Sequence, residues 1–426
     1  MRENAVVITG VGAMTALGHN ADATWRALVA GQTGIRALEG FELDGFDCRV
    51  GAQIRGFDPG ALGFNSKLAR VLDLHSFMLL KCAQDAFVQA GLDTAGVAAE
   101  NVSLFVGMGM VDYKIEDLLS AVRVSTGAQG ELDMDAFYSR GYQQIYPLIT
   151  LVMLNNVSLC EVAIRLRIRG ENAVFSPHAD SGAQAIAEGV RILQEGRAKV
   201  ALVGGVSEKI SPLGLARAHF LGLLNVGDQG FMPCRPFAAD RNGTVLGEGC
   251  GIVNLELRQT ADERGVPYRA AVTGYGCAFE AAEEGAAPTA RAISRAMQLA
   301  LASAEVDPGQ VDVVIAHGDG SRVGDTKEIE AIQQVFSTCL DRIQVFSSKG
   351  LLGHLLAGAI AVDLILATYI ITRGVIPAAL RSVPLDEHLR FNLITEAPCE
   401  AAPRRLLVNC RSNEGHCASL VIEATR

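Results

Sequence analysis

The stretch 175-FSPHADSGAQAIAEGVRILQEG-196 predicts a tight turn that leads into an amphipathic helix. Asp180 and Ser181 stand where a helix N-cap belongs, and Gly196 stands where a C-cap glycine belongs. A nucleophile is favoured at such a turn, because the helix-start N–H groups and the macrodipole stabilise an anion there. The apex of the turn is nevertheless Ala179, which has no reactive group. Apolar residues recur at the spacing of one buried helix face: Ala183, Ile186, Ala187, Val190 and Leu193.

Composition indicates a compact globular protein with neither a nucleic-acid nor a membrane partner. Of the 426 residues, 49% are hydrophobic and the formal net charge is −10, with no basic cluster. The ten cysteines include no C-x-x-C pair, so neither a zinc site nor a disulfide framework is predicted. The opening MRENAVVITGVG lacks an apolar core of signal-peptide length, and residues 351–371 carry His354 and Asp363, which makes that segment too polar to span a bilayer. We therefore expect a reduced, cytoplasmic protein.

Apolar runs typical of strands alternate with helical patterns along the whole chain, which predicts an α/β architecture of stacked layers. Helices are expected at Thr289–Ala304, with Thr289 as the N-cap, and at Asp325–Phe336. The polar stretch Thr260–Tyr268 is expected to be a loop and is the best boundary between two halves of comparable make-up, 1–259 and 260–426. Strands are expected in AVVITGVG, NVSLFVGMG, AKVALVGGV, GIVNLEL, RAAVTGYG, VDVVIAHGDG, IQVFSS and RRLLVNC…ASLVIEA.

Two histidine motifs carry the chemistry that the sequence offers. AHGDGSRVGDTKEIEA places His317 at a strand end and opens the next helix with Asp325 and Glu328, and SSKGLLGHLLAG places Lys349 five residues before His354. Two neutral imidazoles facing one pocket could polarise a carbonyl and stabilise an enolate or oxyanion, with the lysine and the acids orienting and tuning them. The alternative is that the histidines are hydrogen-bonded core residues and that the lysine caps a turn. GVGAMTALG lacks the G-x-G-x-x-G spacing and predicts no dinucleotide site.

Taken together, these motifs resemble the β-ketoacyl-acyl-carrier-protein synthases over essentially the whole chain. The opening VVITGVGAMTALG, the central VALVGGVSEKISPLGLA and RPFAADRNGTVLGEGCGIVNLE, and both histidine motifs carry the resemblance. It implies the thiolase fold: two pseudo-symmetric α/β halves in a five-layer α-β-α-β-α arrangement, which dimerise through strands of the first half.

The resemblance also implies roles for the site residues. Active members of the family carry a cysteine at the position of Ala179, which takes the acyl chain from a thioester and condenses it with malonyl-acyl carrier protein (malonyl-ACP). Residues matching His317 and His354 drive malonyl decarboxylation and stabilise the enolate. Residues matching Lys349, Asp325 and Glu328 support those histidines. Because alanine cannot form a thioester, condensation by this chain alone is excluded.

Further departures from the family's motifs surround the missing cysteine. Asp319 and Ser321 replace the threonines of H-G-T-x-T, which contact the phosphopantetheine arm. Residues 412–417 replace the gating loop G-F-G-G-T-N, with Asn413 and Glu414 changing its character and charge, and Asn242 replaces the aspartate of R-D-G. Ser176, His178 and Ser181 flank the apex. Ser181 is expected to cap the helix and His178 to hydrogen-bond to Asp180, and neither is a convincing replacement nucleophile.

These departures predict a non-condensing partner subunit, the chain length factor of a type II polyketide synthase. Such a subunit pairs with an active ketosynthase as a heterodimer, meets the acyl carrier protein through that partner, and uses no cofactor or metal beyond the carrier's phosphopantetheine arm. Retention of both histidines resembles the subunits of highly reducing or polyene-forming systems. Residues of the acyl tunnel that would set chain length are expected in two segments, with a plain interface role as the alternative: Met108, Met110, Asp112 and Tyr113, then Tyr146 and Leu148.

A second function, malonyl-ACP decarboxylation that makes starter units, fits the retained His317, His354 and Lys349. Family members that do this carry glutamine at the nucleophile position, whereas this chain has alanine there. Asp319 and the altered 412–417 loop also stand against it. The simultaneous changes at Asp319, Asn413 and Glu414 disfavour an engineered cysteine-to-alanine trap.

Overall fold

A computed structural model describes residues 5–63, 72–94, 96–110, 112–113, 115–225, 233–280 and 288–425. In these ranges eleven strands form one continuous sheet in the order β12-β10-β9-β14-β15-β8-β1-β7-β6-β4-β5. The strands are β1 (Val6–Thr15), β4 (Val102–Met108), β5 (Asn172–Phe175), β6 (Val200–Val206), β7 (Gly249–Leu257), β8 (Ala270–Phe279), β9 (Val313–Ile315), β10 (Gln344–Phe346), β12 (Asn392–Leu393), β14 (Arg405–Arg411) and β15 (His416–Ala424). The short pairs β2 (Arg36–Ala37) with β3 (Val50–Gly51) and β11 (Val375–Ile376) with β13 (Cys399–Glu400) lie outside it.

The sheet contains the same strand pattern twice. In the first half, β1 and β7 pair antiparallel, β7 and β6 pair antiparallel, and β6, β4 and β5 run parallel. In the second half, β8 and β15 pair antiparallel, β15 and β14 pair antiparallel, and β14, β9 and β10 run parallel. The halves join where β1 pairs with β8. This repeat confirms the expected pseudo-symmetric α/β architecture.

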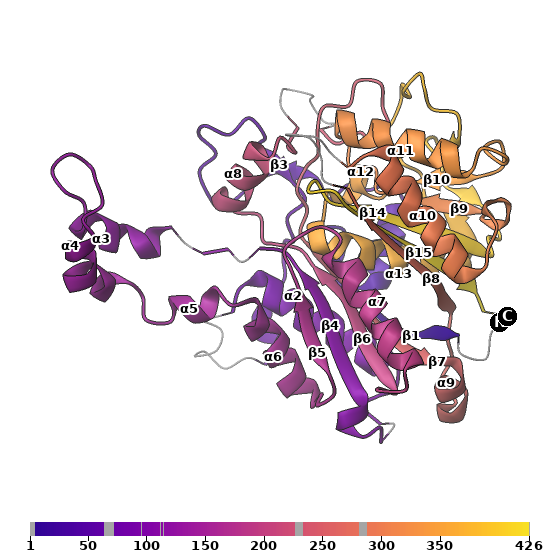
Figure 1. Ribbon diagram of the computed structural model, residues 1–426, viewed down its shortest axis with the longest axis horizontal. Coiled ribbons are helices and arrows are strands. Elements are labelled where there is room, and N and C mark those ends of the chain that lie inside the picture. The colour runs from indigo at the N-terminus through magenta and orange to yellow at the C-terminus, as the bar shows by residue number, and fades with distance from the viewer. Residues whose placement is uncertain are drawn as a thin grey trace.

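The two halves of the sheet form two β layers. Helices lie between these layers and on both outer faces, which gives the five-layer α-β-α-β-α arrangement (Figure 1). Between the halves lie α7 (Ser181–Gln194) and α13 (Ala359–Arg373), and α13 contacts β6 and β7 on one side and β14 and β15 on the other. On the outer face of the first half, α2 (Leu74–Gln89) packs on β1 and β7 and against α6 (Asn155–Leu166). On the other outer face, α10 (Ala290–Ala304) packs on β8 and β15 and against α11 (Arg322–Val335). The remaining helices of the described ranges include α1 (Ala21–Val29), α8 (Pro212–Phe220), α9 (Arg258–Arg264) and α12 (Lys349–Leu352).

Sequence signals account for the start of α10 and for the buried position of α13. The α10 helix begins after Thr289, whose side chain accepts a hydrogen bond from the Ala292 N–H, as predicted. The α13 region is long and apolar enough to cross a membrane, but 78% of the segment Leu356–Arg373 is buried inside the protein. It is therefore the core helix of the middle layer.

The boundary between the halves differs from the sequence prediction. Instead of a loop, residues 258–264 form α9, which ends at Gly265 with φ of 67°. Arg264 anchors this short helix, because its guanidinium donates to the Glu256 carboxylate and to the Ala90 carbonyl (2.6 Å). A polar composition predicted a loop, and these tertiary contacts stabilise a helix instead.

One long segment projects from the body of the first half (Figure 1). We call residues 115–154 the arm; it contains α3 (Glu116–Val124), α4 (Met134–Ala136) and α5 (Ile149–Val152). Many of its large apolar side chains are exposed, which is unusual for a soluble surface and typical of an interaction site. They are Ile115, Leu119, Val122, Val124, Leu132, Met134, Tyr138, Tyr142, Tyr146, Leu148, Leu151, Met153 and Leu154.

Candidate active site

The turn at Ala179 is held close to the second half by residues without side chains. A Cβ on Gly182 would lie 2.4 Å from the Ala357 carbonyl oxygen, and a Cβ on Gly205 would lie 2.1 Å from the same oxygen. Glycine at both positions therefore lets the start of α7 and the end of β6 approach the chain just after His354. The apex Ala179 lines the pocket at this junction.

One thiol contacts the apex: the Sγ of Cys410 donates to the Ala179 carbonyl at 3.2 Å. Burial raises the pKa of Cys410 well above its ordinary value, and the nearby Asp180 carboxylate adds to this effect. A thiol that stays protonated is a weak nucleophile, so Cys410 does not replace the missing cysteine.

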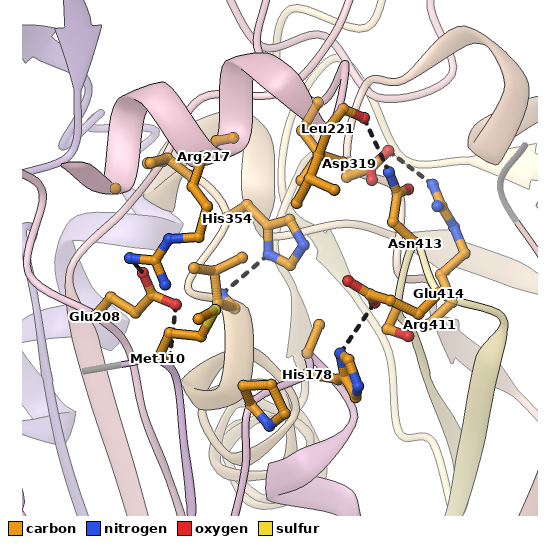
Figure 2. A pocket seen from close by; sticks show the side chains of 18 of the residues that line it. Met110, His178, Glu208, Arg217, Leu221, Asp319, His354, Arg411, Asn413 and Glu414 are labelled. Carbon is orange, nitrogen blue, oxygen red and sulfur yellow. Dashed lines mark hydrogen bonds and ion pairs between the residues drawn. The ribbon is translucent and has the colours of Figure 1, made fainter. Parts of the chain in front are cut away.

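The pocket itself opens between α8 and the loop that joins β14 to β15 (Figure 2). Its volume is about 740 Å³, including the part open to solvent. His317, His354 and Ala179 line it, so the structure brings together the three positions that the resemblance assigned to catalysis. At its mouth, Glu208 pairs with Arg217 of α8 (3.2 Å) and accepts a hydrogen bond from the Met110 N–H.

The two histidines face each other with ring centroids 4.9 Å apart and an interplanar angle of 82°. Nδ1 of His317 accepts from the Arg411 N–H (3.3 Å), and Nδ1 of His354 accepts from the Leu356 N–H (3.1 Å). A nitrogen that accepts a hydrogen bond carries no proton, so each neutral ring holds its proton on Nε2. Burial, aided by the charge of Lys349, lowers the pKa of His354 to about 3 and that of His317 well below its ordinary value. Both histidines are therefore neutral donors.

Asp325 and Glu328 support His317 by a different route from the one expected. Glu328 accepts from the main-chain N–H groups of His317 (2.7 Å) and Gly318 (2.8 Å), and Asp325 accepts from those of Asp319 (3.0 Å) and Gly320 (3.1 Å). These α11 carboxylates fix the backbone of the loop 317–320 and do not contact the imidazoles. Burial, together with the neighbouring charge of Asp319, raises the pKa of Asp325 to about 8.

Lys349 lies beneath the histidines and outside the pocket lining. Its Nζ is 3.5 Å from Asp363 Oδ2 on α13, and it makes no hydrogen bond with the described residues. Its ammonium group makes no hydrogen bond to either imidazole, and its charge lowers the pKa of both rings, which keeps them neutral.

A buried ion pair fills the side of the pocket where the resemblance places a threonine. Asp319 Oδ1 accepts from Arg411 (2.7 Å) and from the Ser321 hydroxyl (2.6 Å), while Asp319 Oδ2 lies 3.6 Å from His317 Nε2. Burial alone would raise the pKa of Asp319, but the Arg411 guanidinium and His317 hold it well below its usual range. Asp319 is therefore an ionised carboxylate, and it lies beside Arg411 at the wall of the pocket (Figure 2).

His317, Asp319 and His354 together have the donor set of a metal site, since one donor atom from each lies within 4.8 Å of the others. A histidine that binds a metal through one nitrogen almost always donates the proton on the other. Here the other nitrogen of each ring accepts a main-chain N–H. The protonated Nε2 atoms fit an oxygen acceptor better than a metal ion.

The mouth loop 412–417 is tied to its surroundings by polar contacts. Asn413 donates to the Leu221 carbonyl (3.3 Å), and Glu414 lies 3.3 Å from Nδ1 of His178 (Figure 2). The prediction that His178 bonds to Asp180 is wrong, because the Asp180 carboxylate turns to the Gln184 side-chain amide (2.6 Å). His178 lines the pocket, facing the loop instead.

Helix α7 begins at Ser181, with Asp180 as its N-cap residue. Neither residue makes the side-chain capping bond that the sequence predicted. Asp180 has helical backbone angles (φ −82°, ψ −5°) instead of the extended ones of a capping residue, and its Oδ2 accepts from the Gln184 amide.

The tunnel candidates lie in different places. Met110 lines the pocket. Met108 is buried in the core under α2, so it does not line the pocket. Asp112 and Tyr113 line a second cavity beside the start of α8. Tyr146 and Leu148 are exposed on the arm and do not meet the pocket within this chain.

Sequence reasoning missed Arg411, which lies at the end of β14 and contacts the site's central carboxylate. The available signal was a charged residue in the apolar run RRLLVNCRS, where an arginine needs a buried partner. It also missed Cys410 against the apex and the Glu208–Arg217 pair at the mouth.

Comparison with known proteins adds family relationships to this geometry. Residues 3–261 match the model of the Beta-ketoacyl synthase N-terminal domain, and residues 269–382 match that of its C-terminal domain. The chain is 26% identical over 419 residues to the 3-oxoacyl-[acyl-carrier-protein] synthase 2 of Staphylococcus aureus (strain N315), covering 98% of each chain. It is 29% identical over 385 residues to the enzyme of that name from Synechocystis sp. (strain ATCC 27184 / PCC 6803 / Kazusa), covering 89% of this chain and 88% of that one.

Solved structures share the fold over the full length. The ishigamide ketosynthase/chain length factor superposes with a TM-score of 0.87 at 24% identity, covering 100% of both chains. A β-ketoacyl synthase from Burkholderia phymatum STM815 gives 0.85 at 24% identity, covering 99% of this chain and 100% of that one. A type II polyketide synthase (PKS) acyl-carrier protein in complex with its ketosynthase, AntDE:AntF, gives 0.83 at 22% identity and covers 100% of both chains.

Proposed function

The chain belongs to the β-ketoacyl synthase family, and we propose that it is the non-condensing, chain-length-factor subunit that pairs with an active ketosynthase in type II polyketide biosynthesis. One observation carries this proposal: the turn, the histidine pair and the pocket are all present around Ala179, which cannot hold an acyl chain. In this proposal, the chain retains the fold around the site but not its nucleophile, and it shapes the acyl tunnel in which the partner ketosynthase builds the chain.

Two surfaces support a partner chain. The arm exposes apolar side chains that a monomer would leave in water. Strand β5 is the outermost strand of the sheet, with β4 as its neighbour within the described residues, so its outer edge offers unpaired main-chain groups. Both lie in the first half, where the resemblance places the dimer contact.

The similar proteins support the kind of partner. One structure is titled as a ketosynthase/chain length factor, and another as a type II PKS acyl-carrier protein in complex with its ketosynthase. By analogy we propose an active ketosynthase as the direct partner and the acyl carrier protein as the source of the phosphopantetheine arm. A highly reducing or polyene-forming system and a cytoplasmic location remain part of this proposal.

Co-expression with a ketosynthase of the same source, followed by assay with malonyl-ACP, tests the proposal. We expect a one-to-one heterodimer that elongates chains, while this chain alone does nothing. Met110→Trp is expected to shorten the products because Met110 lines the pocket. Val88→Trp is the matched control, since Val88 is 51% exposed against 47% for Met110 and lies away from the arm and the pocket. Failure to pair, or products unchanged by Met110→Trp, would contradict the chain-length role.

Malonyl-ACP decarboxylation is the second candidate, favoured by the two Nε2–H donors that face one pocket. In that case this chain alone would convert malonyl-ACP to acetyl-ACP, and His317→Ala would abolish the conversion. That result would replace the partner-subunit proposal.

A further inference from the structure

The carboxylate of Asp319 lies beside both histidines of the pocket. One ring nitrogen of each histidine and one oxygen of Asp319 lie within 4.8 Å of one another. Oδ2 of Asp319 lies 3.6 Å from Nε2 of His317, and this nitrogen makes no hydrogen bond with the described residues. A buried anion therefore lies beside the N–H donors that would stabilise an enolate.

The carboxylate is held in this position from behind. Its other oxygen, Oδ1, accepts from Arg411 (2.7 Å) and from the main-chain N–H (2.9 Å) and hydroxyl (2.6 Å) of Ser321. The side chains of Asp319 and Arg411 are each 2% exposed, so water does not compete for these bonds. With Oδ1 saturated, Oδ2 is free to face the histidines.

We infer that Asp319 is a built-in occupant of the oxyanion position, fixed by Arg411, which keeps the histidine pair from acting on a thioester. A thioester oxygen that gains negative charge next to this carboxylate is repelled by it. The same arrangement gives the two histidines a role in stabilising the fold, because they lie next to the buried negative charge of Asp319. The inference concerns this chain alone, so it holds or fails independently of pairing with a ketosynthase.

Removing the occupant and its counter-charge together tests the inference. The variant Asp319→Thr/Arg411→Met leaves a neutral site, and malonyl-pantetheine is the probe. In the reaction tested, the bond between the carboxylate carbon and the α-carbon breaks, carbon dioxide leaves, and the electron pair forms an enolate that takes a proton to give acetyl-pantetheine. We expect the double variant to make acetyl-pantetheine at least tenfold faster than the wild-type chain.

The matched control adds His317→Ala to the double variant and is expected to return the rate to the wild-type level. Two results would overturn the inference: a wild-type chain as active as the double variant, or a double variant that is folded, as shown by a cooperative melting transition, yet gains no activity.

A second measurement holds even if the double variant does not fold. Nitrogen NMR of the histidine-labelled wild-type chain is expected to show protons on Nε2 of His317 and His354. The isosteric Asp319→Asn variant should shift the Nε2–H resonance of His317. A proton found on Nδ1 of His317, or resonances unchanged in Asp319→Asn, would show that the carboxylate does not engage the ring.

Discussion

At the scale of single residues, the site is dominated by buried charges that compensate one another. Arg411 contacts both Asp319 (2.7 Å) and Asp325 (3.5 Å), and each of the three side chains is at most 2% exposed. Removing one member of such a group leaves an uncompensated charge in the interior, which is far more costly than replacing the pair with apolar side chains. The stability of the loop 317–320 therefore depends on Arg411 as well as on its own sequence.

Arg411→Met alone is expected to lower the free energy of unfolding by about 3–5 kcal/mol, because it leaves the buried, ionised carboxylate of Asp319 without its counter-charge. Adding Asp319→Thr should recover a large part of this loss, so the double variant is expected to be more stable than Arg411→Met. Denaturant unfolding followed by circular dichroism measures both. A double variant that loses the sum of the two single changes would show that the side chains do not act as a pair.

The depressed pKa of His354 predicts a pH-dependent stability. Between its unfolded value of 6.5 and its folded value of about 3, the unfolded chain binds a proton that the folded chain excludes. The free energy of unfolding contributed by this group therefore falls as the pH drops through that window, by at most about 1.4 kcal/mol per pH unit. His354→Gln should lose stability less steeply between pH 6.5 and 4 than the wild type. Equal slopes would contradict a neutral, buried His354.

At the scale of elements, the site depends on how closely α7, β6 and the chain after His354 approach. Gly205→Ala places a Cβ 2.1 Å from the Ala357 carbonyl oxygen, where only backbone can yield. We expect a loss of about 1–3 kcal/mol or more in the free energy of unfolding. Gly309→Ala is the control, since its nearest neighbour would be an Arg342 nitrogen at 3.7 Å and no large change is expected. Thermal melting compares the two, and an equal effect would contradict the tight packing.

Local patterns predicted the elements that carry their own signals. The α7 and α10 helices follow from apolar spacing, and the α10 N-cap follows from Thr289. The α9 helix could not be predicted in this way, because Arg264 stabilises it through contacts with Glu256 and Ala90. The Arg411–Asp319 pair joins residues 92 positions apart, so neither motif alone contains the information. Roles taken from resemblance placed the histidines correctly but missed that the acids bind the loop backbone.

At the scale of the whole molecule, the arm exposes apolar side chains that no part of the same chain covers within the described residues. The arm extends away from the two halves (Figure 1), and many of its large apolar side chains are exposed. An interface that covers this surface would remove these apolar side chains from water and so stabilise a pair of chains. The monomer is therefore expected to associate or aggregate when its partner is absent.

Tyr138→Glu on the arm is expected to abolish pairing with the ketosynthase, because a charge would be buried at the contact. Tyr138 is 68% exposed, so the melting temperature of the isolated chain should not change. Val88→Glu changes an exposed apolar residue outside the arm and should leave the complex intact. Analytical ultracentrifugation of the co-expressed pair measures both, and a heterodimer retained with Tyr138→Glu would place the contact elsewhere.

The position of Ala179 has a consequence for how such a protein arises. The turn is held by glycines that abut the Ala357 carbonyl, and the apex side chain faces the cavity instead of the core. Losing a sulfur atom there removes reactivity without disturbing the fold. On the function proposed above, one copy of a duplicated gene could abandon condensation by a change at this position alone and still keep its fold.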